Sequence, residues 1–140
     1  MTDLAWLNGL EVRSLRDLAE GRYWEFRLGE ATFLNVAAPW RIVMGGRIEI
    51  ARCDHRQQFG LPEKVDVERE GTALLRGHRI VRVVLAQDTA DVSVFFDGDR
   101  RLDVFNESSG YEGWQLKSDD GRLVVALGGG QIAEWGPQDA

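Results

Sequence analysis

The sequence predicts one mainly β domain of the α+β class, built from two antiparallel meanders of four strands each and one linking helix. Apolar and charged residues alternate in several short segments, as at Trp24, Phe26 and Leu28, and this period of two is typical of a half-buried strand. Dipeptides such as Gly45-Gly46 and Asp97-Gly98 separate these segments and favour tight hairpins. Because four strands alone would leave exposed edges, we expect about eight strands in a roll, a closed barrel or a sandwich.

An internal repeat is predicted over about residues 7–52 and 75–127 of the single domain 1–140. When Leu7-Asn8-Gly9 is set beside Leu75-Arg76-Gly77, apolar positions match at one constant offset. The matched pairs are Val12 with Ile80, Leu15 with Val83, Trp24 with Val92, Phe26 with Val94, Leu28 with Phe96, Leu34 with Leu102 and Val36 with Val104. Trp40 then follows Val36 by four positions and its match Trp114 follows Val104 by ten, so the second half carries six additional residues. They lie in a polar loop before Trp114.

The strands are expected at similar places in the two halves. In the first half they cover residues 10–15, 24–28, 31–36, 40–43 and 47–51, and Pro39 separates 31–36 from 40–43 because proline cannot donate a ladder hydrogen bond. In the second half they cover 79–85, 91–96, 101–105, 114–117 and 122–127. We expect Ile48 and Ile50 on one face of their strand, and a tail with Ile132 and Trp135 folded over an open edge or end of the sheet.

One helix is predicted between the halves, at about residues 66–76. Asp66 can cap its start and Gly77 can supply a left-handed stop. The residues on one helical face are Val67, Gly71, Leu74 and Leu75. Glycine costs about 1 kcal/mol in a helix interior relative to alanine, so Gly71 indicates close packing on the sheet.

The net charge, the cysteine count and the lack of long apolar segments limit which kinds of function and which cellular compartment we expect. The formal net charge of -6 argues against non-specific binding to nucleic acid or to an anionic membrane. Cys53 is the only cysteine, which excludes an intramolecular disulfide and a cysteine metal cluster and favours a reducing compartment. No signal-like segment and no apolar run of the ~18 residues that a membrane span needs is present. We therefore expect a cytoplasmic protein of a bacterium-like cell.

The polar loop between residues 105 and 116 contains the first set of candidate site residues, namely Asn106, Ser108, Tyr111, Glu112 and Trp114. On one interpretation, a turn of small residues offers backbone amides while the asparagine, tyrosine and glutamate recognise a ligand or partner. On the other, the asparagine initiates a turn and the two aromatic residues cover the end of the core.

Asp54 and His55 form the second candidate pair. A carboxylate beside an imidazole could serve acid/base chemistry or bind a metal. Adjacent residues cannot close a metal site alone, and the only other histidine, His78, lies at the expected junction of helix and strand. The sequence also has no nucleophile elbow and no phosphate-binding loop. We therefore predict no catalytic residue, no metal site and no cofactor. A locally basic set, which we interpret as a solvated strand face, comprises Arg41, Arg47, Arg52, His55 and Arg56.

The run 102–116 reads Leu-Asp-Val-Phe-Asn-Glu-Ser-Ser-Gly-Tyr-Glu-Gly-Trp-Gln-Leu, with Gly128-Gly129-Gly130 after it and Ala38-Pro39-Trp40-Arg41-Ile42 before it. It resembles a small bacterial family of unknown function, and the likeness covers residues 7–131. Some members of such families look like immunity or accessory proteins encoded near polymorphic toxins. The resemblance thus implies partner binding, and it implies no catalytic residue.

The leading functional hypothesis is a non-enzymatic protein-binding module that recognises a partner through Tyr111 and Glu112. One alternative is a small-molecule binder or weak hydrolase whose pocket at a barrel mouth uses Asp54, His55 and Glu112. Another is a homo-oligomeric structural protein, such as a homodimer, joined through sheet edges or Trp135.

Overall fold

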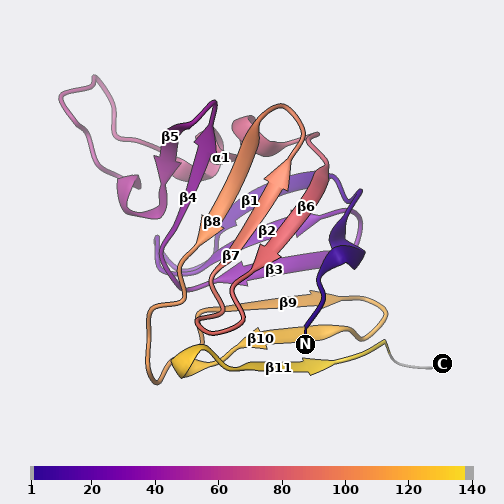
Figure 1. Cartoon of the computed structure of the whole chain (residues 1–140). Coiled ribbons are helices and arrows are strands. Elements are labelled where there is room, and N and C mark those ends of the chain that lie inside the picture. The colour runs from indigo at the N-terminus through magenta and orange to yellow at the C-terminus, as the bar shows by residue number, and fades with distance from the viewer. Residues whose placement is uncertain (1, 138–140) are drawn as a thin grey trace.

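The computed structural model describes residues 2–137 and contains two antiparallel sheets of six and five strands. The sheets pack face to face, and the strands of one run steeply across those of the other (Figure 1). Neither sheet closes into a barrel, so the fold is sandwich-like. The mainly β, α+β class expected from the sequence is thereby confirmed, and the sandwich is the arrangement found among the three that were left open.

The strands follow the expected segments closely. The six-stranded sheet has the order β1 (Val12–Asp17), β2 (Trp24–Leu28), β3 (Thr32–Val36), β9 (Trp114–Ser118), β10 (Leu123–Ala126) and β11 (Ile132–Trp135). The five-stranded sheet has the order β5 (Arg47–Ala51), β4 (Trp40–Met44), β8 (Arg100–Val104), β7 (Val92–Phe96) and β6 (Ile80–Leu85). The tail pairs with β10 as β11, as expected for a segment that covers a sheet edge.

The described chain has eleven strands rather than about eight, because each half contributes five and the tail adds β11. Each half crosses once between the two sheets. After β3 the chain passes Pro39 and enters the other sheet as β4, which pairs with β8. After β8 it crosses in the opposite direction and returns as β9, which pairs with β3. The two ladders have corresponding registers, with Trp40 opposite Val104 and Trp114 opposite Val36. The repeat itself stays a prediction from the sequence.

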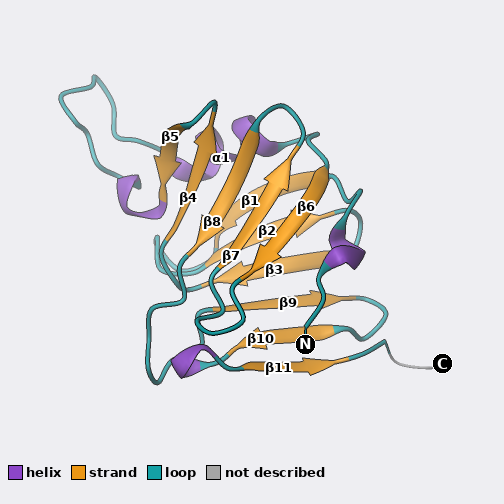
Figure 2. Ribbon diagram, in the orientation of Figure 1, coloured by secondary structure: helices purple, strands orange, loops and turns teal. Residues whose placement is uncertain are grey.

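Helical segments are short (Figure 2). They are η1 (Ala5–Leu7), η2 (Arg52–Asp54), η3 (Gly128–Gly130) and α1 (Val67–Leu75), the single α-helix among residues 2–137. As expected, the Asp66 side chain caps α1 by accepting a hydrogen bond from the Arg69 amide. A Cβ on Gly71 would overlap Leu15 Cδ2, so Gly71 allows α1 to pack closely on β1. In this part of the chain no helix has the length and apolarity to span a membrane.

The core lies between the sheets and is filled from the inward positions of the alternating strands. Trp24 and Phe26 each meet Trp40 edge to face, with ring centroids 5.4 and 5.2 Å apart. Such aromatic pairs contribute about 0.5–1.5 kcal/mol beyond the area they bury. Trp40 and Trp114, which the sequence aligns, are both 2% exposed and fill equivalent core positions.

The expectation that Ile48 and Ile50 share one strand face was wrong. Ile50 is 4% exposed, whereas Ile48 is 53% exposed. The register between β4 and β5 shifts between Ile42 and Val43. Such a bulge changes the side to which the following residues point, and a local pattern of two isoleucines does not encode it.

Candidate functional site

The loop between β8 and β9 is anchored at its start by Asn106. Its backbone amide donates to Asp91 Oδ1 at 2.8 Å, and its side-chain amide donates to the carbonyls of Thr89 and Leu127 at 3.0 and 3.2 Å. These partners come from the β6–β7 connection and from the end of β10. Asn106 therefore ties the loop to two neighbouring segments.

The turn of the loop is organised around Ser108. Its hydroxyl oxygen accepts from the amides of Gly110 and Tyr111 at 3.1 and 2.9 Å, and its carbonyl accepts from the Gly129 amide at 2.9 Å. Gly128 packs against the backbone of Gly110, where a side chain would not fit. The loop is thus held in one conformation by hydrogen bonds within it and by contacts with Gly128 and Gly129.

The end of the loop is fixed by Gly113 and Trp114. The Gly113 amide donates to the Ala126 carbonyl, and its own carbonyl accepts from the amides of Ala37 and Ala38. Trp114 is buried, and its Nε1 donates to the Ala90 carbonyl at 2.8 Å. Three of the predicted site residues, Asn106, Ser108 and Trp114, therefore build and anchor the loop.

Tyr111 and Glu112, in contrast to these anchoring residues, have exposed side chains. Tyr111 is 82% exposed, the highest exposure among the large exposed hydrophobic residues of the described chain, and Glu112 is exposed as well. The anchored loop presents both side chains to solvent.

Glu112 lines a small cavity of about 70 Å³ on the outer side of the six-stranded sheet. The polar residues of its wall are Tyr23, Asn35, Glu112 and Gln115. Asn35 is 7% exposed, and its Oδ1 has no hydrogen-bond partner among the described residues. Burial and the negative charges of Glu112 and Glu25 raise the pKa of Tyr23. The cavity thus combines neutral hydrogen-bonding groups with a negative potential.

Tyr23, Asn35 and Gln115 were missed as site residues by reasoning from the sequence. Asn35 had a detectable signal, since it is a polar residue between Leu34 and Val36 in a strand. Gln115 occupies the position opposite Asn35 in the β3–β9 ladder. Tyr23 lies just before β2, and no local pattern distinguishes it from an ordinary turn residue.

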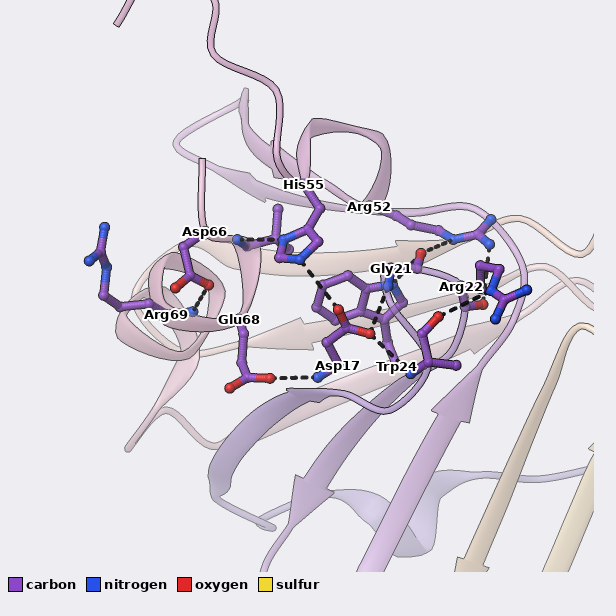
Figure 3. A network of polar contacts seen from close by, with 11 residues as sticks. Asp17, Gly21, Arg22, Trp24, Arg52, His55, Asp66, Glu68 and Arg69 are labelled. Atoms are coloured by element: carbon purple, nitrogen blue, oxygen red, sulfur yellow. Dashed lines mark hydrogen bonds and ion pairs between the residues drawn. The ribbon is translucent and has the colours of Figure 1, made fainter. Parts of the chain in front are cut away.

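His55 belongs to a different cluster, drawn in Figure 3. Its Nε2 lies 3.3 Å from Asp17 Oδ2, and its Nδ1 accepts from the Val67 amide at 3.1 Å. The ring also meets Trp24 edge to face at 5.1 Å. Because Nδ1 accepts, the ring proton lies on Nε2, the nitrogen that faces Asp17.

Asp17 completes this cluster from the end of β1. Its Oδ1 accepts from the amides of Ala19 and Gly21 at 3.1 and 2.7 Å, and its own amide donates to Glu68 Oε2 at 2.8 Å. Arg52 donates to the carbonyls of Gly21 and Arg22. Through these contacts the cluster joins the β1–β2 turn, η2 and the start of α1.

Asp54 lies beside His55 in the chain but makes other contacts. Its Oδ2 accepts from the Ala51 amide at 2.8 Å. It also lines an open groove with Phe59, Leu61 and other residues between β5 and α1. Asp54, His55 and Glu112 thus belong to a groove, a partly buried cluster and the small cavity, respectively. The pocket at a barrel mouth was a wrong expectation, because the sheets do not close.

Within residues 2–137, no group of three or more His, Cys, Asp or Glu side chains is arranged to hold a metal ion. The locally basic residues are spread over separate elements, with Arg41 in β4, Arg47 in β5 and Arg52 in η2. Arg52 and His55 are engaged in the cluster of Figure 3, whereas Arg41 lies on the five-stranded sheet and pairs with Asp103.

Comparison with protein families matches residues 15–136 to one family profile. The chain belongs to the DUF6188 family, a family of unknown function. The expected membership of a family of unknown function is thereby confirmed. No curated protein matches this DUF6188 chain significantly. No solved structure matches it significantly either.

Proposed function

We propose that this chain is a non-enzymatic protein-binding module whose recognition element is the loop 106–113. The observation that carries the proposal is the contrast between a loop anchored at Asn106, Ser108 and Gly113 and a Tyr111 side chain that is 82% exposed. An exposed aromatic residue on a fixed backbone loses little conformational entropy on binding, which is why tyrosine is common in recognition surfaces.

The chemistry beside Tyr111 favours a basic side chain of the partner. Burial is the main reason that the pKa of Tyr23 is raised, and the negative charges of Glu112 and Glu25 raise it further. The electrostatic potential beside Tyr23 is therefore negative. The cavity between Tyr23, Asn35 and Glu112 offers oxygen atoms to a lysine or arginine. We infer that the partner inserts one lysine or arginine side chain next to Glu112. Tyr111 then packs against the surface of the partner around that side chain.

The family resemblance supports the same proposal. Immunity-like and accessory proteins act by binding a partner, and a toxin with a basic surface would suit this acidic chain of net charge -6. We propose that the protein acts in the bacterial cytoplasm. Self-association through sheet edges or Trp135 stays a separate prediction, which sedimentation of the purified chain at high concentration would test.

A comparative pull-down tests the proposal. The tagged wild type and a Tyr111→Ala/Glu112→Ala variant are used as baits in lysate of the native cells, after their thermal stabilities have been shown to be equal. Phe59→Ala serves as the matched control, because Phe59 is another exposed aromatic residue, at 67%, on a different surface. We expect a protein that the wild type and the control capture and the double variant loses. Equal capture by all three baits would contradict recognition through the loop.

A further inference from the structure

The outer face of the five-stranded sheet is uncovered and rich in arginine. In Figure 1 this face is turned to the viewer, and no helix crosses it. Two rows of outward-facing residues cross β4, β8, β7 and β6 in register. One row contains Val43, Arg101, Phe95 and Arg82, and the other contains Arg41, Asp103, Ser93 and Val84. These two rows are called the arginine face below.

Arg41 and Arg101 are oriented by one buried carboxylate. Asp103 is 5% exposed, and it accepts from Arg41 Nε at 2.9 Å, from Arg101 Nε at 3.1 Å and from the Ser93 hydroxyl at 2.7 Å. Both arginines use Nε for this contact. Among residues 2–137 the side-chain hydrogen bonds of both arginines come from Nε and none from a terminal guanidinium nitrogen. Two preoriented donor groups are therefore available to another carboxylate.

Aromatic rings hold the guanidinium groups as well. Arg82 Cζ lies 4.1 Å from the centroid of the Phe95 ring, and Arg41 Cζ lies 5.1 Å from that of Phe105. Cation–π contacts of this kind keep the charged groups in place at little entropic cost. Because a guanidinium already covers a face of each ring, these rings are poorly placed to stack on nucleic-acid bases.

Beside these arginines the surface has a shallow hollow of about 170 Å³ and exposed apolar side chains. Arg82, Arg100, Arg101 and Phe95 line the hollow, and Asp99 is its one carboxylate. Val81 and Val84 are 56% and 47% exposed. Arginine and aromatic residues without lysine are typical of the centre of protein interfaces.

We propose that the arginine face binds an acidic protein segment, whose carboxylates pair with Arg82 and Arg101 and whose apolar side chain lies over Val81 and Phe95. Charge complementarity favours this occupant, since Arg41, Arg82 and Arg101 outnumber the one buried carboxylate of the face, Asp103. A long nucleic acid is disfavoured because it is repelled by the net charge of -6. A short one is disfavoured because guanidinium groups lie over Phe95 and Phe105, the rings on which its bases would stack. A short segment responds mainly to charges within about 10 Å, which here are the arginines.

The test uses the ¹⁵N-labelled full chain and the peptide acetyl-Glu-Glu-Leu-Glu-Glu-Phe-Glu-Glu-amide, titrated with NMR detection. A second peptide with glutamine in place of glutamate and an octameric uridine RNA are the comparison ligands. We expect amide shifts in β6, β7 and β8 with the acidic peptide alone, and binding that weakens as salt is raised. Arg82→Gln and Arg101→Gln should each weaken binding by about tenfold or more.

The controls separate this surface from the loop. Arg69→Gln removes a charge from an exposed position of α1 and should leave peptide affinity unchanged. Tyr111→Ala/Glu112→Ala should also leave it unchanged, so this inference and the proposed function can fail independently. The side chains that donate hydrogen bonds to Asp103 are those of Arg41, Ser93 and Arg101 and do not include Arg82, so Arg82→Gln stays informative even if Arg101→Gln folds poorly.

Three outcomes of the titrations would overturn the inference, and so would a fourth that needs no ligand. They are an acidic peptide that leaves β6 to β8 unperturbed, an equal response to the glutamine peptide, and tighter binding of the RNA on the same face, which would make the ligand a nucleic acid. Shifts of these amides that depend on protein concentration without any ligand would instead assign the face to a second copy of the chain.

Discussion

Gly128 and Gly110 lie backbone against backbone, although one belongs to η3 and the other to the loop between β8 and β9. A Cβ built on Gly128 would come within 2.5 Å of the Gly110 carbonyl carbon, whereas a Cβ on Gly110 would meet no atom within 4 Å. The contact is therefore one-sided. This contact fixes how closely the turn that carries Tyr111 approaches η3. The position of the loop therefore depends on Gly128, a residue outside the loop.

Gly128→Ala should lower the free energy of unfolding by roughly 1–3 kcal/mol, because the added methyl group must displace backbone rather than a flexible side chain. Gly110→Ala is the matched control and should change it by less than about 0.5 kcal/mol. Chemical denaturation measures both. Equal effects of the two substitutions would show that the loop does not rest on Gly128 in solution.

Titration of Tyr23 tests the geometry of the small cavity. Burial raises its pKa first, and the negative charges of Glu112 and Glu25 raise it further, so Glu112→Gln should bring the pKa part of the way back toward its ordinary value. The chain has two tyrosines, so the absorbance of the tyrosinate form is followed in a Tyr111→Phe background. Since the folded state keeps the proton longer, the associated stability is present below about pH 10 and is lost as pH rises. An unchanged Tyr23 pKa in the Glu112→Gln variant would show that the Glu112 carboxylate does not lie near Tyr23 in solution.

Acid sensitivity should reveal the role of Asp103. Burial alone would raise the pKa of this carboxyl, but hydrogen bonds from Ser93, Arg41 and Arg101 outweigh burial and lower it. The resulting stability is present above about pH 4, the ordinary value, and is lost as pH falls below it. Asp103→Asn should therefore cost roughly 1–3 kcal/mol at pH 7 and less in acid, as measured by urea unfolding at several pH values. A difference that does not depend on pH would argue against this account.

His55→Ala should destabilise the fold and leave partner recognition intact once the variant is folded. The substitution removes the acceptor of the Val67 amide and the partner of Asp17, and unsatisfied groups of this kind cost about 1–3 kcal/mol each. His55→Asn is a useful comparison, because asparagine retains an acceptor and a donor. Loss of partner binding at full stability would instead give His55 a direct role.

The secondary structure was largely predictable because its determinants are local. Alternation at Trp24, Phe26 and Leu28 predicts β2, and the Asp66 cap with Gly77 predicts α1. The exchange of strands between the sheets was not predictable in this way. Nothing near Trp40 or Trp114 encodes which distant strand each will pair with, and the bulge that exposes Ile48 depends on the β4–β5 register.

The candidate site was predictable only in part for the same reason. The loop 106–113 was visible as an insertion, but the division between anchoring residues such as Asn106 and exposed residues such as Tyr111 depends on Thr89, Asp91 and Leu127. The pairing of His55 with Asp17 likewise joins segments that are separate in the sequence. Sequence patterns therefore located the loop, whereas tertiary contacts assigned roles to its side chains.

The most direct test of recognition through the loop is photo-crosslinking in the native cells. A photoreactive phenylalanine analogue is placed at position 111 and, as the control, at position 59, where the natural aromatic residue is also exposed. The account predicts one defined crosslinked protein from position 111, absent from position 59 and lost when Gly128→Ala displaces the loop. No adduct from position 111, or the same adduct from both positions, would contradict it.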